Sequence, residues 1–138
     1  MKYGKTLVAS VIFFVLVFLT TYLSTQYLSL QPSSSCMDCS YMRDVLLFSI
    51  TSIFVIPLIV WIQKRAKLGK VVLSIVIGAA FVAIVFFNML NLFQERVSSW
   101  SSYSTGDELL AVLLDSYLYL TVGASITFFV FYKILKVR

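Results

Sequence analysis

Four long apolar stretches constrain the fold of this chain more than any other feature of its sequence. A helix needs about 20 apolar residues to cross the roughly 30 Å hydrocarbon core of a bilayer. The stretches have about this length, and they are Thr6–Leu28, Val45–Ile62, Val71–Phe93 and Leu109–Tyr132. Only short loops and tails remain outside them, so no water-exposed domain of any size is left. We therefore expect one membrane domain over residues 1–138.

The composition fits a chain that is solvated by lipid. Charged residues make up 12% of the sequence and hydrophobic residues 60%, whereas a soluble domain carries about 25% charged residues. Short connections place successive helices side by side and antiparallel. The sequence therefore predicts an all-α integral membrane protein, an antiparallel bundle of four transmembrane helices. Pro57 lies within the second stretch, where it can kink the helix.

The basic residues predict how this bundle is oriented. Lysine and arginine are retained on the cytoplasmic side, next to short loops. Only Arg43 and Arg96 fall on one side of the four-span arrangement. Nine fall on the other: Lys2, Lys5, Lys64, Arg65, Lys67, Lys70, Lys133, Lys136 and Arg138. We expect both termini and the loop Gln63–Lys70 to be cytoplasmic, in a plasma (inner) membrane. The net charge of +5 then reflects topology and contact with anionic lipids rather than nucleic-acid binding.

The sequence leaves little room for chemistry outside one motif. The chain has no histidine, no phosphate-binding glycine loop and no pair of carboxylates spaced for catalysis. Its only cysteines form a C-x-x-C motif, Cys36 and Cys39, which the predicted topology places just outside the membrane, where disulfides persist. Such a pair suits thiol–disulfide exchange, although a structural disulfide or two unpaired thiols fit the spacing as well. A zinc site needs about four ligands, and no further ligands accompany the pair, so we expect no metal.

The surroundings of the cysteines carry a family resemblance. The pattern Cys36-x-x-Cys39-x-Tyr41-x-Arg43 resembles the disulfide bond formation protein B (DsbB) family. Members of that family are four-span thiol oxidoreductases with a redox pair in the first outer loop, followed by an aromatic residue and an arginine. The three serines Ser33–Ser35 would be an insertion relative to the family. The close likeness covers about a fifth of the chain, and the likeness in topology covers all of it.

The resemblance implies a function and a cofactor. Cys36 and Cys39 would take electrons from an extracytoplasmic thiol protein and pass them to a membrane quinone. Arg43 would lie near a carbonyl oxygen of the quinone, where it can stabilise developing negative charge, with Tyr41 in support. One departure is that the second outer segment, Gln94–Glu108, lacks the second cysteine pair of the family. A partner thiol then attacks the first pair directly, a second protein supplies the missing pair, or the motif is a relic or a coincidence.

The residues leave other functions open, including functions without catalysis. The chain could be an accessory or structural subunit of a larger membrane complex, with Cys36 and Cys39 as a structural disulfide. Arg43 could then be an interfacial cation that pairs with Asp44 or with lipid phosphate. Whether the chain is an enzyme is therefore not decided by its sequence.

Three polar residues in or near the spans raise the further possibility of transport. Asn88 and Asn91 lie three residues apart on the third stretch and could line a pore, although hydrogen bonds to neighbouring helices are the simpler expectation. Asp115 would be costly within the membrane and is a functional candidate by default. It would instead reach the head groups if Asp107–Leu114 lay along the interface.

Overall fold

In the computed structural model, which describes residues 3–134, the chain is helical and forms no strand within that range. The α-helices are α1 (Tyr3–Ser24), α2 (Tyr41–Ile50), α3 (Val55–Ala66), α4 (Lys70–Arg96) and α5 (Thr105–Ile134). Three short 3₁₀ segments join them: η1 (Gln26–Leu28), η2 (Thr51–Phe54) and η3 (Ser98–Trp100). Four helical stretches are long and apolar enough to cross a membrane: Gly4–Ser24, Tyr41–Ala66, Lys70–Trp100 and Thr105–Ile134. The predicted all-helical fold with four such helices is confirmed.

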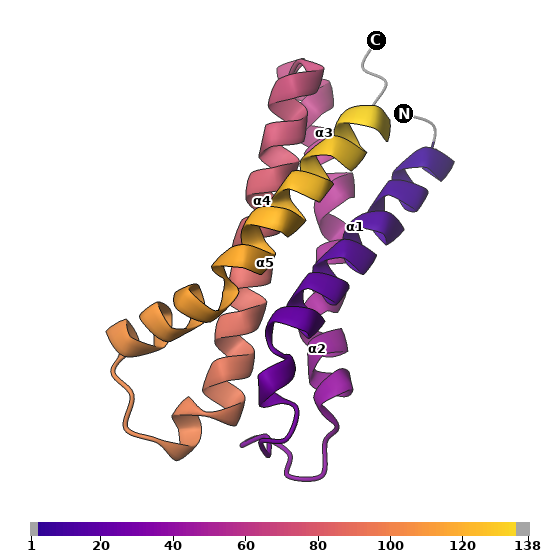
Figure 1. Ribbon diagram of the computed structural model, residues 1–138. Coiled ribbons are helices and arrows are strands. Elements are labelled where there is room, and N and C mark those ends of the chain that lie inside the picture. Colours follow the sequence, from indigo (N-terminus) through magenta and orange to yellow (C-terminus); the bar gives the residue numbers. More distant parts are fainter. Residues whose placement is uncertain (1–2, 135–138) are drawn as a thin grey trace.

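The helices run up and down, so the bundle has two different ends (Figure 1). The start of α1, the α3–α4 connection and the end of α5 lie together at what we call the basic end. It carries six of the nine predicted cytoplasmic cations: Lys5, Lys64, Arg65, Lys67, Lys70 and Lys133. Lys2, Lys136 and Arg138 lie outside the described residues. The opposite end, the cysteine end, holds the cysteine loop (residues 29–40) and the serine loop (residues 97–104).

The second spanning stretch is longer than predicted and is interrupted. It begins at Tyr41 rather than Val45, because the Ser40 hydroxyl caps α2 by accepting a hydrogen bond from the Arg43 backbone N–H (3.3 Å). The 3₁₀ segment η2 divides it one turn before Pro57. Proline has no N–H to donate and its ring crowds the carbonyl four residues earlier. The predicted disturbance at Pro57 is thus present as a break between α2 and α3.

The fourth spanning helix also begins before the predicted apolar stretch. Its cap is Ser104, whose hydroxyl accepts from the Asp107 N–H (3.3 Å) and donates to the Asp107 carboxylate (2.6 Å). The first part of α5 runs at a steep angle to the remainder, which follows the bundle (Figure 1). The segment Asp107–Leu114, for which an interfacial position was the alternative to a place in the span, lies in this inclined part.

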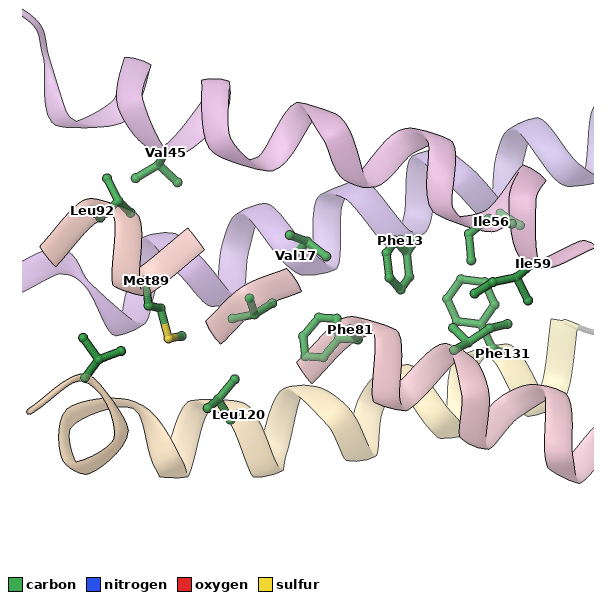
Figure 2. Packing of buried hydrophobic residues seen from close by; sticks show 14 of the residues in the cluster. Phe13, Val17, Val45, Ile56, Ile59, Phe81, Met89, Leu92, Leu120 and Phe131 are labelled. Atoms are coloured by element: carbon green, nitrogen blue, oxygen red, sulfur yellow. The ribbon is translucent and has the colours of Figure 1, made fainter. Parts of the chain in front are cut away.

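An aromatic cluster at mid-bundle holds α1, α4 and α5 together. Phe13, Phe81 and Phe131 are fully buried, and Phe13 meets the other two rings edge to face, with centroids 6.2 and 5.9 Å apart (Figure 2). Gly123 permits this packing, since a Cβ there would lie 2.8 Å from the tip of the Phe81 ring and 3.1 Å from the Thr20 hydroxyl. The absence of a side chain at Gly123 is therefore what lets α5 approach its neighbours.

Candidate disulfide site

The cysteine loop is closed by a disulfide bond between Cys36 and Cys39. Their Cα atoms lie 5.3 Å apart, and the Cys39 N–H donates to the Cys36 carbonyl (3.1 Å), which makes a tight turn. Both cysteines are half-buried, whereas Met37 between them is 72% exposed. The turn therefore stands at the surface of the cysteine end, within reach of another molecule.

Arg43 lies directly beside one of the two sulfur atoms. The cap at Ser40 starts α2 so that the Arg43 side chain turns back toward the loop, and its Nη1 donates to Cys39 Sγ (2.6 Å). The guanidinium is exposed and is not paired with its neighbour Asp44, which bonds to a different arginine. A cation at this distance stabilises a thiolate on Cys39 when the disulfide is reduced. The structure thus brings together three of the predicted site residues.

Tyr41, the fourth predicted site residue, is built into the helix packing. Its side chain is 7% exposed, its hydroxyl donates to the Tyr22 carbonyl (2.7 Å), and it shares a hydrogen bond with the Thr25 hydroxyl (2.8 Å). Its ring also lies against that of Tyr22, with centroids 5.4 Å apart. Tyr41 therefore fixes the start of α2 against the end of α1. It supports the loop through this packing, and its hydroxyl is already engaged.

Arg96 is a central residue of the site that the sequence analysis did not single out. Its side chain is 2% exposed, and its Nη2 contacts the Asp44 carboxylate at 2.6 Å. Nη1 donates to the Gln31 carbonyl, and Nη2 also reaches the Cys39 carbonyl (3.4 Å). The guanidinium lies 5.5 Å from the centre of the Tyr41 ring. One buried cation thus joins α2, α4 and two points of the cysteine loop, Gln31 and Cys39.

Glu95 holds the part of the cysteine loop that precedes the disulfide. Its carboxylate accepts hydrogen bonds from the Ser34 hydroxyl (3.0 Å), the Ser35 N–H (3.2 Å) and the Ser33 hydroxyl (3.4 Å), while its carbonyl accepts from the Ser34 N–H (2.9 Å). The three serines that looked like an insertion therefore bind the end of α4. Glu95 and Arg96 together attach the cysteine loop to the end of α4. Arg96 bonds to Gln31 and Cys39, and Glu95 bonds to the serines between them.

The polar residues considered for transport do not gather within a single copy of the chain. Asn88 is buried, and its Nδ2 has no hydrogen-bond partner among the described residues. Asn91 on α4 and Asp115 on α5 are exposed. The expected hydrogen bond from Asn88 to a neighbouring helix is therefore not formed through its amino group. Within residues 3–134 no group of three His, Cys, Asp or Glu side chains could hold a metal ion.

The fold and the site define a helical protein with four helices able to span a membrane and a half-buried C-x-x-C disulfide in a surface turn at one end. Comparison with protein-family models, with curated proteins and with solved structures found no match to the chain. The chemistry of the site must therefore be argued from its own residues.

Proposed function

We propose that the chain is a DsbB-like membrane thiol–disulfide oxidoreductase that passes electrons from a thiol partner through Cys36 and Cys39 to a membrane quinone. The observation that carries the proposal is the Arg43 guanidinium, 2.6 Å from Cys39 Sγ in an exposed turn. A cation beside one sulfur of a C-x-x-C pair favours thiol–disulfide exchange.

The short spacing of the cysteines argues against a loop staple. A disulfide stabilises a fold chiefly by closing a loop in the unfolded chain, and for a loop this small the chain-entropy relation gives only about 2 kcal/mol. The loop is already held to α4 by the hydrogen bonds of Glu95 and Arg96. The disulfide is therefore better explained by reactivity than by anchorage.

The positions of the two sulfurs assign them different roles. A thiolate of the partner attacks Cys36 Sγ, the Cys36–Cys39 bond breaks, and a mixed disulfide forms between the partner and Cys36. Cys39 leaves as a thiolate, because the adjacent Arg43 makes it the better leaving group. A second partner thiolate then attacks the partner's own sulfur in the mixed disulfide and releases Cys36. The partner is thereby oxidised by two electrons, and Cys36 and Cys39 are reduced.

The same residues suit a quinone as the oxidant. A quinone would accept two electrons from the reduced pair, with the two protons of the quinol coming from the Cys36 thiol and from water, and the disulfide would be restored. Arg43 is exposed and has five N–H donors, so it can hold the Cys39 thiolate and still donate to a ligand oxygen. Tyr41 keeps the start of α2, and hence Arg43, in place.

The proposed reaction also requires a particular orientation in the membrane. The serine loop carries no cysteine, and in this proposal the partner exchanges directly with Cys36 in the surface turn. The basic end faces the cytoplasm of a cell with a plasma or inner membrane, as its cations favour. The cysteine end then faces the oxidising compartment that disulfide chemistry needs.

Thiol trapping in isolated membranes tests the proposal. The membranes receive a brief pulse of reductant and are then incubated with or without added quinone. Free thiols are finally blocked with a maleimide that changes gel mobility. We expect the pair to be reduced by the pulse and reoxidised only with quinone. Cys36→Ser should abolish turnover, and Met42→Ala, an exposed neighbour, should not. A pair that resists reduction, or reoxidises equally without quinone, would overturn the proposal; if loss of both cysteines then impaired only assembly, a subunit role would explain the chain.

A further inference from the structure

Arg96 donates hydrogen bonds to the backbone of the cysteine loop. We infer that it is a positioning residue that sets the redox equilibrium of Cys36 and Cys39. This inference rests on the proposed function. Its two terminal nitrogens reach two backbone carbonyls of the cysteine loop, that of Gln31, ahead of the disulfide, and that of Cys39 itself. Because a guanidinium is rigid and planar, it fixes the position of one carbonyl relative to the other.

The buried ion pair means that Arg96 acts through geometry rather than through net charge. Arg96 is 2% and Asp44 8% exposed, and their charges are 2.6 Å apart. The Asp44 carboxylate therefore cancels most of the field that Arg96 would exert on the sulfurs. Arg43 differs, since it is exposed, is not paired with Asp44, and contacts Cys39 Sγ itself.

These environments predict opposite effects of the two arginines on the disulfide. By tying the Cys39 carbonyl to that of Gln31, Arg96 holds the loop between them in its turn after reduction. The two thiols then stay close, which raises their effective concentration and favours the oxidised form. Loss of Arg96 should therefore make the disulfide easier to reduce. Arg43 stabilises the Cys39 thiolate, which exists only in the reduced form, so loss of Arg43 should make the disulfide harder to reduce.

Equilibration of the purified full-length chain with glutathione buffers in detergent tests the inference, with the reduced fraction measured by alkylation and mass spectrometry. Arg96→Met should shift the equilibrium toward the thiols by about tenfold, the effect of losing one charge-assisted hydrogen bond, or about 30 mV. Arg96→Lys keeps a positive charge beside Asp44 but cannot bond to both carbonyls as the planar guanidinium does. Its reduced fraction should lie between those of the wild type and Arg96→Met. Arg43→Met should shift the equilibrium in the opposite direction.

A second variant separates positioning from misfolding. Arg96→Met alone leaves the Asp44 charge buried without a partner, which can unfold the chain. The double variant Asp44→Leu with Arg96→Met removes both charges, and we expect it to keep the wild-type circular dichroism while showing the same shift toward the thiols. An unchanged equilibrium in the folded double variant would overturn the inference, as would shifts of the same sign for Arg43→Met and Arg96→Met.

The wild-type result separates failure of this inference from failure of the proposed function. If the wild-type pair does not exchange with glutathione at all, the proposed function fails and the inference fails with it. If the wild-type pair exchanges but the Arg96 variants match it, only the role of Arg96 is refuted.

Discussion

Two arginines at the cysteine end, Arg43 and Arg96, have different surroundings and different roles. Arg43 is exposed and bonds to Cys39 Sγ, whereas Arg96 is buried and bonds to Asp44 and to backbone carbonyls. Burial of a charge is tolerated only with a partner, which Asp44 supplies. The exposed arginine is thus available for chemistry, and the buried one for structure.

The reactivity of Cys39 should depend on Arg43. In a Cys36→Ser background, where Cys39 is the only thiol, Arg43→Met should slow alkylation by iodoacetamide at neutral pH by about fivefold. That factor corresponds to roughly 1 kcal/mol, the upper range for an exposed charge pair. Stopped alkylation followed by mass spectrometry measures the rate. Met42→Ala in the same background is the control, and equal rates for Arg43→Met and Met42→Ala would contradict the prediction.

Tyr27 predicts a pH dependence at the edge of the bundle. Partial burial of its side chain, and then the nearby Asp115 carboxylate, raise the pKa of Tyr27 above the ordinary value of 10.0. The folded chain therefore holds this proton where the unfolded chain releases it, so stability is unaffected below pH 10.0 and falls as the pH rises above it. Thermal unfolding in detergent at rising pH measures the fall. Tyr27→Phe should reduce it and Asp115→Asn should reduce it less; identical pH profiles for Tyr27→Phe and the wild type would refute the assignment.

At the scale of elements, the contact of α5 with α1 and α4 depends on Gly123. Phe81 cannot yield to a new side chain there, because its ring is fully buried against Phe13. Gly123→Ala should therefore destabilise the fold by about 1–3 kcal/mol, as overpacking usually does. The matched control is Gly78→Ala on α4, where a Cβ meets nothing within 4 Å, and helix propensity favours alanine. Thermal unfolding in detergent should rank Gly123→Ala below the wild type and Gly78→Ala at or above it; the reverse order would contradict the packing described.

The sequence predicted the helices well and their ends less well. Apolar length identifies a span, but the helix starts at Tyr41 and Thr105 are set by hydroxyl caps at Ser40 and Ser104, which hydropathy does not register. The break before Pro57 was predictable because the cause is local.

For the site, the sequence indicated the residues that are close along the chain. Cys36 and Cys39 form one turn, and Arg43 follows in the first turn of the next helix. Their spacing along the chain was therefore enough to predict that they lie together. The ion pair of Arg96 with Asp44 joins residues 52 positions apart, and its register depends on how α2 and α4 pack. The only signal in the sequence was Arg96 at the end of an apolar stretch, and this signal does not indicate that Asp44 is its partner.

At the scale of the whole molecule, the two ends of the bundle differ in how they treat charge. The exposed basic end places cations over aromatic rings, Arg65 over Trp61 (5.2 Å) and Lys70 over Tyr132 (4.1 Å), where they can meet lipid head groups. The cysteine end has two cations among the described residues, of which Arg96 is bonded within the protein and only Arg43 is exposed. This difference favours insertion with the basic end retained in the cytoplasm.

Site-directed labelling tests that orientation. In a Cys36→Ser, Cys39→Ser background, Ser102→Cys places one thiol in the exposed serine loop and Ala66→Cys places one at the exposed end of α3. A membrane-impermeant maleimide added to cells with an intact inner membrane should label the Ser102→Cys protein, and should label the Ala66→Cys protein only after the membrane is disrupted. The reverse pattern would put the disulfide in the reducing cytoplasm, where glutathione keeps thiols reduced. The oxidoreductase proposal depends on this result as much as on the sulfur chemistry, because Arg43 can activate the pair only on a side where a disulfide persists.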